Sequence, residues 1–352
     1  MERRRRREKA NAEMSEVWDF QRIDFDSAPW DDIESCPDHT VFKTRAWMRY
    51  ILATQSVEPV VLSLGRGGRT AGYFVTALIK KAGLKILASP FPGWTTSFQG
   101  ASFIDPEPPW DRGELYAALI RFAFGKLGCV HFECLDMYVG KESLDEAGVP
   151  YEMDRNYWID LSQTEEELFA GFQSRCRGAI RKAKKNGVVV AQPEDPEQFA
   201  DDYYDQLIDV FAKQGKVPMY PRSRLAALVR HVHPTGNLLL LESRGPDGKC
   251  IGTGIFPGFN TLMQYWGGAS YRSGQILRPN EILVFEAMNY WRKRGISIFE
   301  LGGGGTYKEK FGPAFAPRPR IIAPRWRIVK HMKRAARWLV GLKRRIWRGG
   351  LK

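Results

Sequence analysis

Hydrophobic and polar positions along the chain form two blocks that have the same order of elements. The first block has two strands, an aromatic and glycine-rich segment, a helix and a closing strand, at residues 60–64, 71–79, 90–103, 114–127 and 130–135. The second block repeats this order at residues 238–242, 250–256, 263–271, 280–294 and 296–301. The repetition predicts two copies of an α/β domain, each with a mixed sheet covered by helices. The alternative is a pair of unrelated α/β units.

The stretch between the two blocks has a helical pattern and is basic in part. We expect helices at residues 164–172, 174–188, 201–212 and 222–231. The chain then divides into a basic tail, a first domain, a second domain and a basic amphipathic helix, at residues 1–16, 17–150, 151–323 and 324–352. A cleft between two such domains is a common place for a ligand site.

The charge of the chain is concentrated at its two ends. The net charge is +13 over 352 residues, with an arginine run from Arg3 to Arg7 and no Asp or Glu after Phe311. Apolar residues make up 43% and charged residues 26%, as in an ordinary globular protein. The basic ends therefore predict a polyanionic partner, which is RNA, anionic lipid or a nucleotide-linked substrate.

The last part of the chain has apolar residues at helical spacing among many Lys and Arg residues. The apolar positions are Ile328, Met332, Ala335, Leu339, Leu342 and Ile346. This pattern predicts that residues 325–352 bind an anionic membrane surface, with RNA binding or packing on the protein as alternatives. The sequence shows neither a secretory signal nor a membrane-spanning run. We therefore expect a cytoplasmic protein, peripheral on the inner face of the cytoplasmic membrane.

The cysteines favour neither disulfides nor a metal. Their number is five and they include no CxxC pair, which fits a reducing compartment. Cys129, His131 and Cys134 lie in an apolar stretch that is typical of a strand, where Cys134 points away from the other two. We expect no metal.

Several segments resemble a known family when they are taken in order. The basic helix carries the pattern R-x-x-I-R-K-A-x-x-x-G, at Arg177, Ile180, Arg181, Lys182, Ala183 and Gly187. FKTRAWMRY precedes it, and YWGGASYRSGQILRPNEILVFEAMNYWRKRG and ELGGGGTYKEKFG follow it. Together these blocks resemble FemAB-like and BioF2-like acetyltransferases of the GNAT superfamily over roughly residues 40–323. The resemblance implies two tandem GNAT-like domains that transfer an acyl group.

The chain departs from the family at two places. Glu300 stands where the closing strand usually has Asp, and the CoA-binding signature is missing, since Arg272 leads into RSGQIL. The donor therefore stays undecided between acyl-CoA and aminoacyl-tRNA, so that tRNA is also a candidate partner.

Candidate site residues come from the resemblance and from residue chemistry. Lys308 and Glu300 are the expected catalytic residues, with Glu300 as a base. We expect Arg177, Arg181, Tyr265, Trp266 and Tyr307 to bind substrate. Arg177 and Arg181 share one helix face, where a phosphate or carboxylate would offset their repulsion. The alternatives are a solvated helix face for the arginines, a surface lysine at 308, and core packing for Tyr265 and Trp266.

These features predict a GNAT-type acyltransferase. It would transfer an acetyl or aminoacyl group to an amine or hydroxyl of an anionic cell-envelope or polysaccharide precursor, as in peptidoglycan or exopolysaccharide synthesis. The alternative function is a non-catalytic adaptor on membrane or RNA, built on a degenerate GNAT pair.

Overall fold

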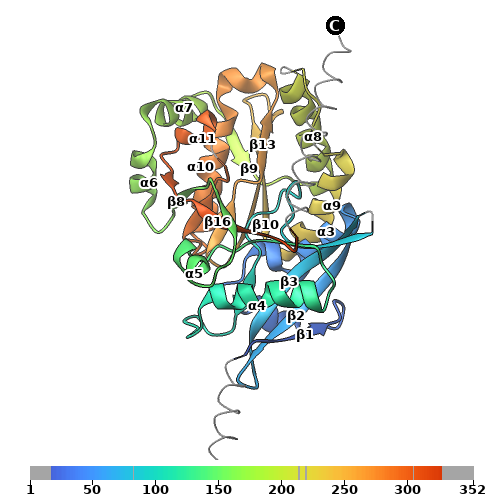
Figure 1. Ribbon diagram of the computed structural model, residues 1–352. Helices are drawn as coiled ribbons and strands as arrows, with labels where there is room; N and C mark the ends of the chain where they lie inside the picture. Colours follow the sequence, from blue (N-terminus) through green and yellow to red (C-terminus); the bar gives the residue numbers. More distant parts are fainter. Residues whose placement is uncertain (1–16, 82, 213–214, 219, 304, 327–352) are drawn as a thin grey trace, which may run out of the picture.

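The computed structural model describes residues 17–326 except 82, 213, 214, 219 and 304. Two mixed β-sheets, each with helices packed against it, form one body (Figure 1). The predicted fold class, a pair of α/β units with mixed sheets, is confirmed. The basic helix that was predicted for residues 324–352 lies almost entirely outside the described residues.

The first sheet contains strands from both ends of the described chain. Its strands are β1 (Asp19–Ile23), β2 (Val57–Arg66), β3 (Arg69–Lys81), β4 (Leu84–Ser89), β5 (Ala101–Phe103), β6 (His131–Leu135), β7 (Tyr151–Asp154) and β16 (Arg318–Pro324). Their order is β1-β2-β3-β4-β6-β16-β7, with β5 paired to β3. The β4–β6 pair is parallel and the other pairs are antiparallel.

The second sheet repeats this plan. Its strands are β8 (Tyr157–Asp160), β9 (Val189–Ala191), β10 (Leu238–Arg244), β11 (Cys250–Phe259), β12 (Leu262–Gln264), β13 (Gly267–Ser270), β14 (Ile298–Glu300) and β15 (Ala314–Phe315). Their order is β15-β8-β14-β12-β11-β10-β9, with β13 paired to β11. In both sheets an antiparallel meander leads into one parallel pair, β4–β6 or β12–β14. The internal repeat in the sequence is thus a repeat of strand topology.

The helices include those expected from the sequence, close to their expected limits except for α8, which begins at Pro196 and not at residue 201. They are α2 (Trp30–Glu34), α3 (Arg45–Thr54), α4 (Arg112–Gly125), α5 (Lys141–Glu146), α6 (Glu165–Gly171), α7 (Ser174–Lys185), α8 (Pro196–Ala212), α9 (Arg222–Val232), α10 (Pro279–Arg292) and α11 (Thr306–Glu309). Short 3₁₀ helices are η1 (Val41–Lys43), η2 (His233–Thr235) and η3 (Arg272–Leu277). Side-chain caps start several of them: Thr164 and Glu167 form a reciprocal capping box on α6, and Asp111 caps α4. Within the described ranges, no helix is both long and apolar enough to cross a bilayer.

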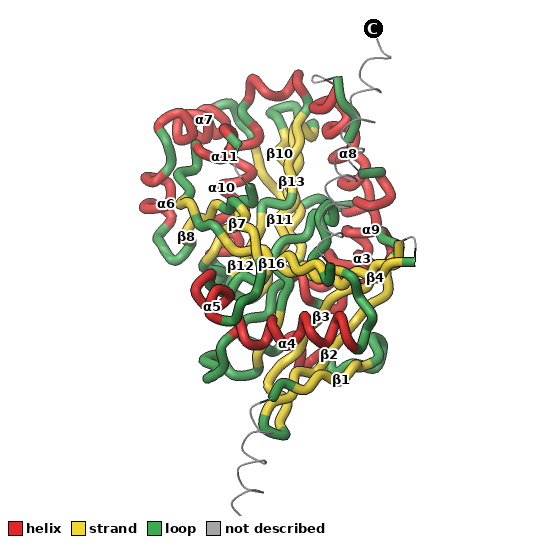
Figure 2. Tube along the Cα trace, viewed as in Figure 1, coloured by secondary structure: helices red, strands yellow, loops and turns green. Residues whose placement is uncertain are grey.

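The two halves share strands and core. Residues 151–154 and 318–324 pair within the first sheet, although the limits expected from the sequence place them in the second domain. One apolar core contains Trp47 and Tyr50 from the first half and Leu228 and Leu240 from the second. Helix α3 packs against α9, which packs against α8 (Figure 2). The halves therefore form a single packed unit, which fixes the geometry of their join.

The close approach of β3 and β5 gives a test of this packing. A Cβ at Gly72 would lie 2.0 Å from the Ser102 carbonyl oxygen, so the two strands would have to separate. We expect Gly72→Ala to lower the free energy of unfolding by about 1–3 kcal/mol in urea titration. Gly125→Ala, in α4 with no neighbour within 4 Å of the added Cβ, is the matched control. Equal stability of both variants and the parent protein would contradict the strand contact.

Candidate functional site

The second sheet opens where β13 separates from β14. Strand β12 pairs with β14 as far as Gln264, and the Tyr265 N–H still donates to the Glu300 carbonyl at 2.9 Å. The next N–H, that of Trp266, donates instead to Ile255 at 3.1 Å, and β13 then follows β11 alone. The parallel pair therefore ends at these residues, next to Glu300 at the end of β14.

Glu300 ends β14 and is buried, with a relative exposure of 1%. Its Oε2 atom accepts hydrogen bonds from Gln264 Nε2 at 2.6 Å and from Ser97 Oγ at 3.1 Å. Ser97 belongs to the first half, so the carboxyl group joins the two halves. Burial raises the pKa of Glu300, and the bonds from Gln264 and Ser97 oppose this rise only in part.

Lys308 lies close to Glu300, in α11. Its Nζ donates to the Leu301 carbonyl and lies 5.8 Å from the Tyr265 ring centroid. A Cβ at Gly302 would be 3.7 Å from this Nζ and 3.6 Å from Glu300 Oε1, so both groups flank the same glycine. Burial lowers the pKa of Lys308, and the charge of Glu300 opposes that effect. The predicted catalytic pair is thus brought together, although no bond between the two side chains is formed.

Two predicted aromatic residues lie beside this pair. The rings of Tyr265 and Tyr307 stack at 6.4 Å between centroids, with an angle of 24°. Burial raises the pKa of Tyr265 to about 12, so its phenol stays neutral. Lys308 lies near the Tyr265 ring and Lys310 near the Tyr307 ring, so the stacked pair separates the two ammonium groups.

Trp266 points to the other side, towards the first half. Its Nε1 donates to the Thr95 carbonyl at 2.9 Å, and its ring lies 5.6 Å from that of Tyr220. The loop that carries Thr95 and Ser97 therefore touches both sides of the opening. Sequence reasoning missed Ser97 and Gln264, because only the fold brings the first copy's aromatic segment to this strand end.

A cationic pocket of about 610 Å³ opens between α7, α10 and α11. Its lining includes Arg175, Lys182, Arg278 and Lys310, together with Glu281. Glu281 pairs with Lys310 at 2.6 Å, and the Lys310 ammonium lies 3.6 Å from the Tyr307 ring centroid. Burial lowers the pKa of Lys310, while Glu281 opposes the shift. One carboxylate faces four cations, so the pocket suits an anionic ligand.

Residues 170–310 match the acetyltransferase (GNAT) domain family. This segment is a GNAT domain. The matched residues include Glu300, Lys308 and the whole lining of the cationic pocket. The match confirms the predicted acyltransferase class.

Solved structures extend the fold match to both halves of the chain. The structure of FemX is 12% identical, covers 86% of this chain and 96% of its own, and has a TM-score of 0.66. A tandem GNAT protein from the clavulanic acid biosynthesis pathway is 11% identical, covers 88% and 99%, and has a TM-score of 0.51. A protein of unknown function from Bacteroides thetaiotaomicron is 11% identical, covers 88% and 100%, and has a TM-score of 0.54. The predicted FemAB-like, tandem GNAT fold is confirmed. A search of curated proteins gives no match.

The arginines of the GNAT domain that were expected to bind phosphate make contacts within the protein. Arg177 Nη1 donates to the Ala170 carbonyl at 3.0 Å and also to that of Phe172, which closes the end of α6. The Arg181 guanidinium lies 5.3 Å from the Phe169 ring centroid. Neither residue lines the cationic pocket, whose α7 cations are Arg175 and Lys182. The role of Arg177 and Arg181 in substrate binding stays a prediction.

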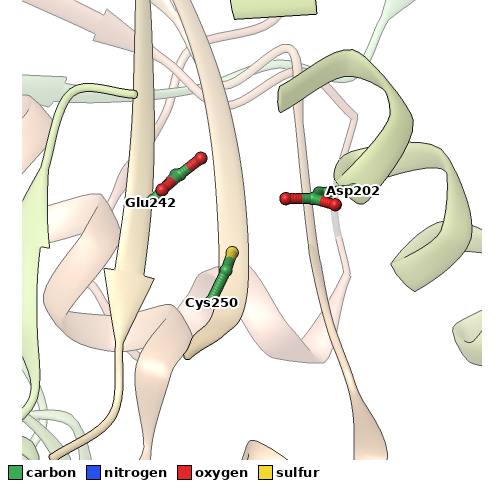
Figure 3. A group of neighbouring side chains, drawn as sticks. All are labelled: Asp202, Glu242 and Cys250. Carbon is green, nitrogen blue, oxygen red and sulfur yellow. The ribbon is translucent and has the colours of Figure 1, made fainter. Parts of the chain in front are cut away.

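One group of potential metal ligands occurs among the described residues (Figure 3). Asp202, Glu242 and Cys250 place ligand atoms within 4.8 Å of one another. Glu242 already pairs with Arg244 at 2.5 Å, and Cys250 Sγ accepts a hydrogen bond from Gln206 Nε2 at 3.4 Å. Two of the three side chains thus have partners within the protein, and we assign no metal to the group.

The raised pKa of Glu300 predicts a stability that depends on pH. The folded protein holds this proton more tightly than the unfolded chain, so stability is lost as pH rises from the ordinary glutamate range through the raised pKa. Glu300→Gln cannot ionise and should avoid that loss. We expect its melting temperature, relative to the parent protein, to rise as the pH increases from the ordinary glutamate range through the raised pKa.

Glu142→Gln is the control for this measurement, because Glu142 is exposed on α5. Its melting temperature should follow that of the parent protein at every pH. A difference for Glu300→Gln that is constant over the whole range would show that Glu300 ionises normally.

Proposed function

We propose that the protein transfers an acyl group to an amine or hydroxyl of an anionic cell-envelope or polysaccharide precursor. The observation that carries this proposal is the pair of Glu300 and Lys308 on either side of Gly302, at the point where the GNAT sheet opens. A non-catalytic adaptor would have no use for a buried acid beside a half-buried lysine. The likeness to FemX is one of fold, and the expectation of a cell-envelope acceptor rests on the FemAB-like resemblance of the sequence.

Each group has a distinct role in the proposed reaction. The acceptor nitrogen or oxygen attacks the acyl carbonyl carbon, and Glu300 accepts the proton that the nucleophile loses. Its raised pKa makes it a stronger base than an exposed glutamate. The carbonyl oxygen becomes an oxyanion, which the Lys308 ammonium stabilises. When the bond to the donor breaks, the proton passes from Glu300 to the leaving sulfur or oxygen atom.

The donor would carry phosphate groups into the cationic pocket. Arg175, Lys182 and Arg278 supply charge there, and Tyr307 and Lys310 connect the pocket to Lys308. Acyl-CoA is the donor that a GNAT domain favours, whereas aminoacyl-tRNA would also place phosphates in this pocket. In a chain with the CoA-binding signature, backbone amides at the start of this helix would face a diphosphate. Here the signature is missing, and Glu281 occupies the first turn of α10.

Membrane association is part of the proposal only through the sequence. Residues 325–352 have the pattern of a helix that binds anionic lipid, and all but two of them lie outside the described residues. A peripheral position on the inner face of the cytoplasmic membrane, and work on peptidoglycan or exopolysaccharide precursors, therefore stay predictions.

Removing the Lys308 charge should reduce turnover without unfolding the protein. We expect Lys308→Met to lower kcat by about 10²–10³-fold, as when a preorganised oxyanion donor is lost. The control is Lys249→Met, in the exposed turn between β10 and β11, which should keep full activity. Release of the leaving group is the measurement. Full activity of Lys308→Met would remove Lys308 from the mechanism.

A labelled-donor experiment should identify the activated acyl group. Acetyl-CoA and charged tRNA, each with a radiolabelled acyl group, are compared under the same conditions with a cell-envelope precursor extract. We expect transfer from acetyl-CoA, and a Lys310→Met variant should raise KM for the donor because the variant leaves Glu281 unpaired in the pocket. Transfer from charged tRNA alone would overturn the assignment of acyl-CoA and keep the acyltransferase.

A further inference from the structure

Helix α4 is apolar on its outer face as well as on the face that it packs against the first sheet. Leu119 belongs to the core of the first half. Ala117, Ala118 and Phe122 are only partly buried, and after the first turn the helix has a single charged residue, Arg121. A helix that is apolar all round is normally covered on every side, so we expect a partner on this outer face.

A groove of about 920 Å³ follows the outer face of α4, between this helix and the start of β1. Trp18, which lies just before β1, forms its apolar wall together with Phe20 and Phe122. The rings of Phe20 and Phe122 are in contact, with 5.2 Å between their centroids. The groove therefore offers aromatic surface that no element of the described chain covers.

The charged residues of the groove leave an excess of positive charge. Arg66 pairs with Glu114 at 3.3 Å, so these two charges balance. Arg121 and Lys126 are exposed and have no acid partner within the described ranges. Asp19 is the remaining acid of the lining. The groove thus combines an apolar wall with cations at its rim.

Both described ends of the chain lie beside this groove. Val17, the first described residue, lines the groove and has a relative exposure of 66%. Arg325 Nη1 donates to the Phe124 carbonyl at 3.1 Å, and Phe124 precedes Gly125, which also lines the groove. Trp326, the last described residue, has a relative exposure of 51%. The segments that precede Val17 and follow Trp326 are therefore both attached at this face.

Those two segments carry much of the positive charge of the chain. Residues 1–16 include the run from Arg3 to Arg7, and residues 327–352 contain ten Lys and Arg residues and no acid. An anionic phospholipid surface matches this charge and the groove together, because its phosphates attract cations and its interface accepts Trp and Phe side chains. RNA would match the charge, whereas its phosphate backbone has nothing apolar to place in the groove.

We propose that the outer face of α4, with its groove, is the surface by which the protein lies on an anionic phospholipid membrane. The groove takes apolar lipid groups at the boundary between headgroups and acyl chains, and Arg121 and Lys126 meet lipid phosphates. The basic segments at both ends of the chain add to the attraction through their charge. Lipid binding at this surface needs no reaction, so it stands apart from the proposed acyl transfer.

This orientation has a consequence for the cationic pocket. The pocket lies between α7, α10 and α11, at the end of the molecule far from α4 (Figure 1). On a membrane that meets α4, the pocket is therefore far from the lipid. If the proposed function holds, a water-soluble donor reaches the pocket while the protein stays bound.

Sedimentation with vesicles measures the contribution of the α4 face. The probes are vesicles of phosphatidylcholine with and without phosphatidylglycerol, and the readout is the fraction of full-length protein that sediments with them. We expect Lys126→Glu to weaken the partition onto the anionic vesicles about tenfold, because it reverses one charge at the surface. Lys185→Glu is the matched control, since Lys185 is an exposed lysine in the last turn of α7. Its net charge equals that of Lys126→Glu, and it should partition like the parent protein.

A labelled cysteine reports whether the face itself touches lipid. Gly125 is exposed, and a Cβ there has no neighbour within 4 Å, so Gly125→Cys should fold normally. The label is added in a Cys250→Ser background, because the other four cysteines are buried. An environment-sensitive dye at residue 125 should shift its emission to the blue on anionic vesicles. The same dye on Gly171→Cys, at the end of α6, should not shift.

Three results would overturn the proposal. The first is sedimentation that is no greater with anionic than with neutral vesicles. The second is an equal loss of partition in Lys126→Glu and Lys185→Glu, which would show that net charge alone matters. The third is an unshifted dye at residue 125 on vesicles that do sediment the protein, which would leave the binding to the end segments.

Two further outcomes separate this proposal from its neighbours. A dye shift at residue 125 with single-stranded RNA, and none with vesicles, would assign the α4 face to RNA in place of lipid. An inactive protein that still binds anionic vesicles through residue 125 would support the membrane surface and refute the acyltransferase alone.

Discussion

The separation of β13 from β14 is the constraint on which the rest of the site depends. A parallel pair that continued past Tyr265 would satisfy its backbone groups and close the sheet. Because the Trp266 N–H turns to the opposite neighbour, the parallel pairing ends beside Glu300, and the Glu300 carboxyl group is left to meet Ser97 of the first half. At this change of partner, Tyr265 lies towards Lys308 and Trp266 towards the first half. The side chains of these two neighbouring residues therefore lie on opposite sides of the chain.

The first half completes the surroundings of the GNAT domain. Its loop supplies Ser97 to Glu300, the Thr95 carbonyl to Trp266 and the Gly93 carbonyl to Arg224. A carboxyl group buried this deeply is costly without donors, and in Glu300 both donors reach Oε2, whereas Oε1 has none among the described residues. Two neutral donors, one from each half, stabilise it without cancelling the rise of its pKa. The second copy of the fold therefore forms the cationic pocket, and the first copy supplies part of the surroundings of Glu300.

Much of the fold could be predicted from the sequence because its signals are local. Apolar periodicity and the glycines after each long helix located α4 and α10 to within a few residues. The repeat also predicted the shared topology. The resemblance named Glu300 and Lys308, which the fold does bring to one glycine, although their roles remain predictions.

The remainder depends on contacts between residues far apart in the chain, which no local pattern encodes. Ser97 is an ordinary loop serine until the first half packs against β14, and Arg224 resembles its exposed neighbour Arg222 in the sequence. The direction of the α7 cations is another example. Spacing puts Arg177 and Arg181 on one face, as expected, but that face lies on α6, and Arg175 and Lys182 line the pocket.

Strand β16 gives the molecule a definite order of assembly on the ribosome. It fills the place between β6 and β7, yet it is encoded at residues 318–324, after the whole GNAT domain. While the chain emerges, the first sheet has a gap, and the edges of β6 and β7 have unpaired backbone groups. The first sheet is therefore completed only after the second half has been synthesised. A nascent chain that stalls before residue 318 leaves the edges of β6 and β7 unpaired, and such edges are prone to aggregation unless chaperones cover them.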